Sequence, residues 1–204
     1  MILCVTPEDR EKRREPGPSN KVELFGDRAV PWDGPCGHLV TQGPDVANPA
    51  HFHEADQFQI FVAGSGRMGN HRVKVGTIHY ADGYRGYGPI VPDQGGCSYL
   101  SLRPTYDTSR HLIPQEAELA RGRKGSQRMA EFDLSADVPQ GVATLLYRND
   151  GVGAYQQNVG ANQPLPMVET KGGSYWLVLR GSITCDGRDC PTETCIWVGE
   201  GGDR

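Results

Sequence analysis

The sequence predicts an all-β protein built from short strands with few helices. Glycine and proline supply 27 and 15 of its 204 residues, and this density of turn-forming residues argues against long helices. Several short runs alternate apolar and polar side chains, which is the pattern of a strand with one buried face. Strands of this kind, separated by turns, are typical of a β-sandwich or β-barrel.

Residues 1–20 are predicted to form a flexible tail. Thr6 is a suitable N-cap for a helical turn, because Pro7 follows at the first helical position and Glu8 and Asp9 come next. Such a helix has no apolar stripe to bury, so we expect it to fray.

The clearest strand covers residues 58–62, FQIFV, where Phe58, Ile60 and Val62 form an alternating apolar set and Gly64 follows. Other strands are predicted at 21–24, 72–80, 97–102, 141–147, 174–179 and 194–198, and a single helical segment at 115–124. FQIFVAGSGRM from Phe58 aligns with YWLVLRGSITC from Tyr175, which is a weak internal repeat.

Composition restricts the function. Lys plus Arg number 21 against 25 for Asp plus Glu, a net charge of −4, so we expect no nucleic-acid partner. No apolar run approaches the roughly 18 residues of a membrane helix, and the N-terminus has no secretory pattern. The chain is therefore expected to be cytoplasmic. Its six cysteines are expected to be free thiols, and a metal role for Cys185, Cys190 and Cys195 is the weaker alternative.

A histidine pair precedes the clearest strand, in HFHEADQ at 51–57. Residues i and i+2 of a strand point to the same face, so His51 and His53 are expected to project together. Neutral imidazole nitrogens are common ligands of zinc, copper and iron, so this pair is a candidate metal site.

These residues resemble the first motif of the cupin superfamily, which reads H-x-H, three or four residues, an acid, six residues and a glycine. Here His51 and His53 are followed by three residues, Gln57, six residues and Gly64. The spacing matches, and a glutamine replaces the acid. The resemblance covers residues 35–104 well and 140–204 more loosely. It implies jelly-roll barrels, also called double-stranded β-helices.

The second cupin motif starts with a glycine and ends with a third metal-binding histidine. Counted from Gly76, its proline, glycine and histidine positions fall on Asp82, Tyr84 and Tyr87. The spacing carries over but the residues do not, and Tyr87 takes the place of the third histidine.

The resemblance implies a divalent metal ion, which could be iron, manganese, nickel, copper or zinc. His51, His53 and Gln57 would be its ligands, and Tyr87 could add a phenolate. The alternative is a metal-free histidine pair at the barrel mouth that hydrogen-bonds a ligand or a buried water.

In the second copy of the repeat, Val168, Thr170 and Ser174 stand at the positions of His51, His53 and Gln57. These three residues cannot replace the histidines as metal ligands. The chain is therefore similar to a bicupin with two related repeats, of which the second barrel is degenerate. The sequence ends at Arg204, near the expected second motif of that barrel. N-terminal strands, another subunit or sequence beyond Arg204 would have to complete it.

The predicted organisation is therefore a tail (1–20), a cupin-like barrel with the candidate site (21–104), a linker with a short helix (105–135) and an incomplete second repeat (136–204). Because an open barrel exposes a sheet edge, we expect a homodimer.

The segment YADGYRGYGPIVP, from Tyr80, places aromatic rings and a cation near the predicted barrel mouth. Tyr80, Tyr84, Arg85 and Tyr87 are its candidate ligand-lining residues. Such a set suits a small planar or anionic ligand, and the alternative is a tyrosine-rich edge that packs over the barrel.

Three functions follow from these patterns. The favoured one is a metal-dependent enzyme of dioxygenase or isomerase type acting on a small molecule, with Tyr87 and Gln57 as candidate catalytic residues. The second is a non-catalytic cupin that binds a small ligand without metal. The third is a structural or assembly role. Fold alone does not choose among them.

Overall fold

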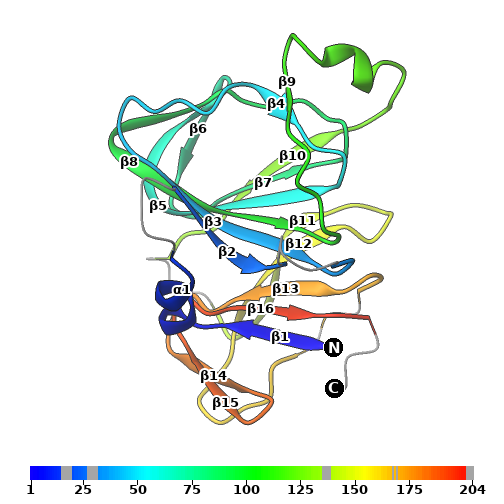
Figure 1. Cartoon of the computed structure of the whole chain (residues 1–204). Coiled ribbons are helices and arrows are strands. Elements are labelled where there is room, and N and C mark those ends of the chain that lie inside the picture. The colour runs from blue at the N-terminus through cyan, green and yellow to red at the C-terminus, as the bar shows by residue number, and fades with distance from the viewer. Residues whose placement is uncertain (15–19, 27–31, 135–138, 167, 169, 201–204) are drawn as a thin grey trace.

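The computed structural model describes residues 1–14, 20–26, 32–134, 139–166, 168 and 170–200. Strands dominate them (Figure 1), as the all-β prediction requires. The strands are β1 (Ile2–Val5), β2 (Lys21–Phe25), β3 (Cys36–Gln42), β4 (His51–Phe52), β5 (Gln57–Met68), β6 (His71–Lys74), β7 (Thr77–Ala81), β8 (Ile90–Arg103), β9 (His111–Leu112), β10 (Gln127–Glu131), β11 (Gly141–Tyr147), β12 (Gly153–Asn158), β13 (Ser174–Leu177), β14 (Ser182–Cys185), β15 (Arg188–Pro191) and β16 (Cys195–Val198). The helices are α1 (Pro7–Arg13) and the 3-10 helix η1 (Ala117–Ala120). No helix in the described ranges combines the length and apolar character needed to cross a membrane.

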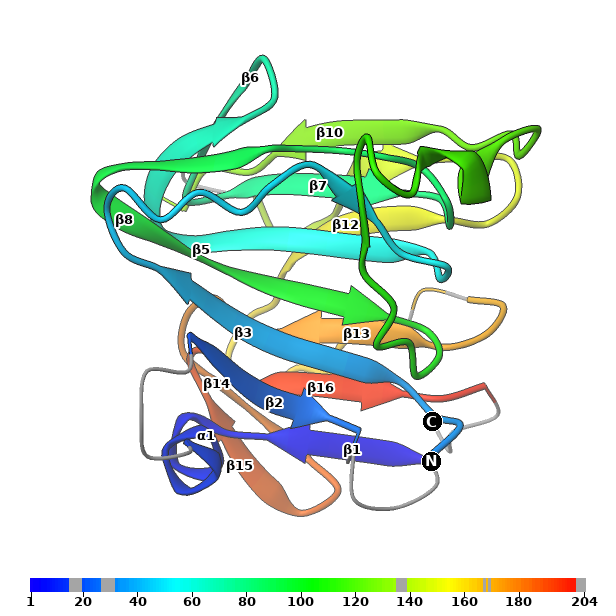
Figure 2. The same ribbon diagram turned by 45° about the horizontal axis from the view of Figure 1, so that its top comes forward.

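The largest sheet is antiparallel, with strand order β10-β7-β5-β8-β3-β2 and β6 paired to β5. Its two longest strands, β5 and β8, form the centre (Figure 2). The short pair β4–β9 joins this unit through bridges from Asn48 to Ile90 and from His51 to Tyr87. Over the described residues the ladder ends at β2 and at β10, so a closed barrel is not confirmed.

Alternation along β5 separates two environments. Phe61 belongs to the cluster inside the curved sheet, whereas Phe58, Ile60 and Val62 pack on its outer face. Strand β8 alternates in the same way, because Tyr99 faces inward and Leu100 faces outward. Each strand therefore contributes to two cores, as its period-two pattern predicts.

A second sheet, in the order β1-β16-β13, covers that outer face (Figure 1). Its contact with the large sheet is an apolar core around Trp197, whose ring lies 4.6 Å from that of Tyr175. The other fully buried members are Val5, Leu24, Phe25, Leu100, Leu102 and Cys195. The two sheets thus pack face to face, and the interior of the large sheet is left for the site.

Within the predicted tail, residues 1–14 contain a strand and a helix, and residues 15–19 lie outside the described residues. The first residues of the chain form β1, which runs antiparallel to β16 with Ile2 opposite Val198. Thr6 caps α1 and forms a capping box with Asp9, as expected. The helix is anchored by an ion pair of 2.6 Å between Arg10 and Glu193. Partners distant in the sequence therefore order a segment that has no apolar stripe of its own.

The predicted linker, 105–135, belongs largely to the first unit. Strand β9 pairs with β4, and β10 extends the large sheet beside β7. The predicted helix at 115–124 is reduced to η1, in line with the weak helical composition around Gly122. The first unit therefore extends past residue 104 to Glu131.

The C-terminal part contains hairpins β11–β12 and β14–β15 besides β13 and β16. Of the predicted strands, 141–147 matches β11, while 174–179 and 194–198 overlap β13 and β16. These elements do not form a closed second barrel, so the two-repeat architecture is not confirmed. The strand that extends this sheet is β1, from the other end of the chain.

Candidate ligand-binding site

A cavity of about 360 Å³ opens on the inner face of the large sheet. It is bounded by β3, β5 and β8 and by the segment 46–53 that leads into β4. The lining residues are Asn20, Lys21, His38, Val40, Gln42, Val46, Ala47, Asn48, Pro49, His51, His53, Gln57, Gln59, Tyr87, Tyr99, Ser101, Arg103 and Arg110. Polar side chains predominate in this wall, and those of His38, Gln42, Gln57, Gln59, Ser101 and Arg103 come from β3, β5 and β8.

The two histidines of the sequence motif lie side by side in the cavity wall. The ring centroids of His51 and His53 are 5.1 Å apart and the rings are nearly perpendicular. His51 Nδ1 lies 2.6 Å from the carbonyl oxygen of Pro49, and His53 Nδ1 bonds the carbonyl oxygen of Ser109. A carbonyl can only accept, so each Nδ1 carries the proton and each Nε2 presents a lone pair.

Both lone pairs already have donors. The Tyr87 hydroxyl lies 3.0 Å from His51 Nε2, and Gln57 Nε2 donates to Tyr87 Oη over 2.7 Å. His53 Nε2 lies 2.9 Å from an amino group of Arg103. The structure therefore brings His51, His53, Gln57 and Tyr87 together in one hydrogen-bond network, which also includes Arg103.

Arg103 was not indicated by the sequence analysis. Its guanidinium donates to Gln57 Oε1 through both Nε, at 3.0 Å, and an amino group, at 2.7 Å. Its other amino group donates to the carbonyl oxygen of Asp107 at 2.6 Å. Ser101 Oγ also donates to Gln57 Oε1, over 2.8 Å. In the part of the chain that the structure describes, every hydrogen-bond partner of this guanidinium is neutral.

The cavity is electropositive. Arg103 is only 4% exposed, and Lys21 and Arg110 also line the space. Of the described residues that line it, none carries a carboxylate. Burial lowers the pKa of His53 to about 2, with the charge of Arg103 as the next cause. Burial also lowers the pKa of His51 to about 4. Both histidines are therefore neutral at pH 7, and the arginines set the sign of the charge.

His38 and His79 are also buried, and of these two His38 lines the cavity. His79 Nδ1 is 2.9 Å from Gln59 Oε1, and its Nε2 is 3.2 Å from Gln127 Oε1. Burial lowers the pKa of His79 to about 4. His79 lies on β7, within the predicted strand 72–80.

The other predicted lining residues lie elsewhere. Tyr80 points to the opposite face of β7, where its hydroxyl bonds Asp56 and Asp82. The guanidinium carbon of Arg123 lies over the ring of Tyr84, 3.7 Å from the centroid of that ring. Neither these two tyrosines nor Arg85 lines the cavity, and Tyr87 does. Alternation along β7 explains the difference, because Tyr80 follows the inward-facing His79.

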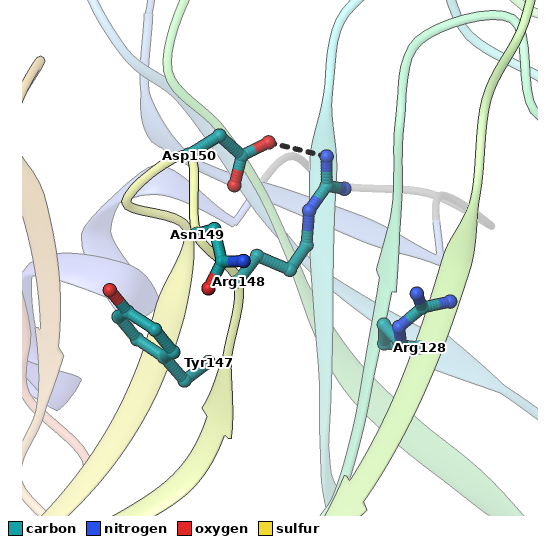
Figure 3. A pocket seen from close by; sticks show the side chains of 5 residues that line it. All are labelled: Arg128, Tyr147, Arg148, Asn149 and Asp150. Atoms are coloured by element: carbon teal, nitrogen blue, oxygen red, sulfur yellow. Dashed lines mark hydrogen bonds and ion pairs between the residues drawn. The ribbon is translucent and has the colours of Figure 1, made fainter.

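A shallower depression of about 440 Å³ lies between β10 and the β11–β12 hairpin. Figure 3 shows Arg148 turned toward Asp150 at one end, with Arg128 beyond it. Arg148 forms ion pairs with Asp82 and Asp150, so its charge is compensated. In the inner cavity the hydrogen-bond partners of Arg103 are neutral, and the Asp107 carboxylate interacts with this cation through charge alone. This cavity is the better candidate site.

The donor set does not fit the divalent metal that the resemblance implies. Such an ion would need to lie about 2.1 Å from His53 Nε2, where an amino group of Arg103 now lies 2.9 Å away. Gln57 turns its carbonyl oxygen to the same guanidinium. A dication would have to displace this cation or lie against it. Across the described residues, no group of three His, Cys, Asp or Glu is arranged to hold a metal ion.

Known structures share this fold. The nickel(II) complex of the bacterial pirin YhhW from Escherichia coli has a TM-score of 0.55 and 9% identity, covering 99% of this chain and 91% of that one. Salicylate 1,2-dioxygenase from Pseudoaminobacter salicylatoxidans, in adducts with gentisate, has a TM-score of 0.51 and 11% identity, covering 98% and 75%. No protein-family model and no curated protein sequence matches the chain.

At these identities the likeness shows the fold alone, and that fold is the cupin fold. The sequence motif, the strand order and the inward-facing histidines are consistent with it.

Proposed function

We propose that this chain is a cupin-type protein that binds a small organic anion, with Arg103 as the fixed cation of the site. The observation that carries the proposal is the hydrogen bond of 2.9 Å from Arg103 to His53 Nε2. It places a permanent positive charge beside the histidines, where the family pattern implies a metal ion. The protein would then bind its ligand without a resident metal.

Charge selects the class of ligand. Arg103 is buried, and the Asp107 carboxylate that interacts with its charge does not line the cavity. An anion that enters the cavity would therefore meet this cation from the open side and help to offset the cost of burying it. The hydrogen bonds of Arg103 are made to neutral protein groups, so we propose that it acts mainly through its charge. Arg110 donates to Asn48 Oδ1 over 2.7 Å and is exposed at the rim, where it can contact an anionic group directly.

Gln57 and Tyr87, the candidate catalytic residues, take a positioning role in this proposal. Gln57 joins the two halves of the network, because its amide nitrogen donates to Tyr87 and its oxygen accepts from Arg103. Burial raises the pKa of the Tyr87 hydroxyl, which keeps it protonated as the donor to His51. Both residues would thus hold the histidines in one tautomer.

A metal-dependent dioxygenase or isomerase is the second candidate. Both histidines donate Nδ1–H to a carbonyl and turn Nε2 inward, which is the arrangement of metal-ligating histidines. The pirin YhhW structure with nickel(II) supports the same candidate. For it to hold, the Arg103 side chain must leave His53.

The test of anion binding uses small carboxylates, each paired with its neutral amide, such as benzoate with benzamide. We expect carboxylates to raise the thermal unfolding midpoint while the amides do not. Arg110→Gln should weaken carboxylate binding about tenfold, which corresponds to about 1.4 kcal/mol. Arg128→Gln, in the outer depression, is the matched control and should bind as the wild type does. Equal stabilisation by amides, or none by any carboxylate, would reject the proposal.

The finer architecture also remains our proposal. We propose that β13, β16 and β1 are the remains of a second cupin repeat that lost its metal ligands. The antiparallel pairing of β13 with β16 supports it, because the repeat in the sequence aligns β13 with β5. Edge strands β2 and β10 are the surfaces through which we expect a homodimer to form.

A further inference from the structure

Two thiols from opposite ends of the chain are in contact. Cys4 Sγ, on β1, lies 3.1 Å from Cys190 Sγ, on β15. A disulfide has sulfur atoms about 2.05 Å apart, so an approach of about 1 Å separates the contact from a bond. Cysteine spacing does not indicate this pair, because the two residues are 186 positions apart.

The fold explains the contact. Val5 and Leu3 pack toward the core between the two sheets, so Cys4 between them faces the other side of β1. The β14–β15 hairpin brings the fully buried Cys190 to that side. An ion pair of 2.6 Å between Arg188 and Asp9 ties the same hairpin to α1. The two thiols are thus held together by elements anchored on both sides.

We propose that Cys4 and Cys190 form a reversible disulfide when the protein meets a low-molecular-weight disulfide such as oxidised glutathione. Cys4 is partly accessible and Cys190 is buried, so Cys4 reacts first and Cys190 second.

The chemistry balances in two exchange steps. The Cys4 thiolate attacks one sulfur of oxidised glutathione, forming a mixed disulfide and releasing one glutathione thiolate. The Cys190 thiolate then attacks the Cys4 sulfur, so the protein disulfide forms and the second glutathione leaves. The two thiol protons pass to the two glutathione thiolates, and two electrons reduce the glutathione disulfide.

Two other cysteines lie near this pair and define the alternatives. Cys185 is on β14 of the same hairpin and is partly exposed. Cys195 is buried in the core on the opposite face of the small sheet, as the cross-strand partner of Val5. Cys185 could therefore compete for either thiol, whereas Cys195 points away.

The link would clamp the first strand of the chain to its C-terminal hairpin. A covalent bond that closes so long a loop restricts the unfolded chain strongly. The ligand cavity lies on the inner face of the large sheet, beyond the core between the sheets. Oxidation is therefore expected to raise thermal stability and leave carboxylate binding unchanged.

The experiment equilibrates the folded, full-length chain in buffers of oxidised and reduced glutathione, followed by acid quenching, alkylation and peptide mapping by mass spectrometry. We expect the peptide with Cys4 to be joined to the peptide with Cys190, and the thiol count under denaturing conditions to fall by two from six. Dithiothreitol should restore all six. Burial raises the pKa of the Cys4 thiol to about 12, so the rate of oxidation should increase with pH.

Two variants separate the outcomes. Cys185→Ser should form the same link and show the same rise in unfolding midpoint on oxidation. Cys190→Ser should give neither the link nor the rise. An unchanged thiol count, a link between other cysteines, or glutathione adducts that do not resolve would each overturn the proposal.

Discussion

Replacing Arg103 by alanine is expected to raise the affinity for nickel(II) at least about a hundredfold, because like charges at 4 Å repel by about 4 kcal/mol per unit charge at an effective dielectric constant of 20. The variant loses the guanidinium that lies 2.9 Å from His53 Nε2. It also releases the oxygen of Gln57 from that cation. His53 Nε2 would then be free, and His51 and Gln57 would complete the donor set that the sequence motif implies once the hydroxyls of Tyr87 and Ser101 rotate away from them. Isothermal titration calorimetry with nickel(II) measures the change.

The matched control is Arg110→Ala, which removes a positive charge at the rim without releasing His53. We expect it to change nickel affinity far less than Arg103→Ala does. Circular dichroism checks that both variants fold. Equal nickel affinity in folded Arg103→Ala and wild type would show that Arg103 does not block the histidines.

Acidification from pH 6.5 to 4.5 is expected to remove most of the folding free energy. The pKa of His53 is lowered to about 2, and those of His51 and His79 to about 4, all mainly by burial. Because the pKa of each histidine is lower in the folded state, the unfolded state binds more protons than the folded state does below about pH 6.5. The free energy of unfolding therefore falls as the pH decreases. The unfolded histidine is only half protonated at pH 6.5, so the slope rises toward about 1.4 kcal/mol per pH unit as the pH falls, and each histidine loses about 2 kcal/mol over the window, about 6–7 kcal/mol for the three. Small domains have about 5–15 kcal/mol in total.

Urea unfolding at several pH values measures this loss. The variant His79→Gln should reduce the slope of unfolding free energy against pH by about 1.4 kcal/mol per unit, the share of one histidine. His71→Gln is the control, because His71 is exposed at the start of β6. His111 has the opposite effect on stability, because Glu116 and Glu54 raise its pKa. Its contribution is small because the side chain lies near the surface, where water screens the charges. A stability independent of pH between 6.5 and 4.5 would contradict the burial of neutral histidines.

The sequence predicts the local parts of this site well. The H-x-H pair, the strand after it and the placement of Tyr87 near His51 follow from alternation and motif spacing. These features depend on residues close in the sequence, or on the fold that the motif implies.

Arg103 could not be placed in the same way. It follows the predicted strand 97–102 by one position, and its partner Gln57 is 46 positions earlier. The available signal was alternation, because Tyr99 and Ser101 face inward and the next inward position is Arg103. An arginine at an inward position of a strand indicates a buried charge that either has a function or makes many hydrogen bonds within the protein.

Long-range pairing also explains the errors in the fold. Strand β1 depends on β16, at the other end of the chain, and no local pattern predicts that partner. The composition of the tyrosine-rich segment predicts Tyr80 at the barrel mouth. In the structure the Tyr80 hydroxyl instead bonds Asp56 and Asp82 on the outer face of the sheet.

The most direct test of the central claim is the metal content of the wild-type chain. The protein, purified without exposure to metal resin and then dialysed against nickel(II), would be measured by inductively coupled plasma mass spectrometry beside the His51→Ala/His53→Ala double variant. If Arg103 takes the place of the metal ion, both proteins should hold equally little nickel, far below one ion per chain. Close to one nickel ion per wild-type chain, lost in the folded double variant, would contradict the account and establish a metal centre.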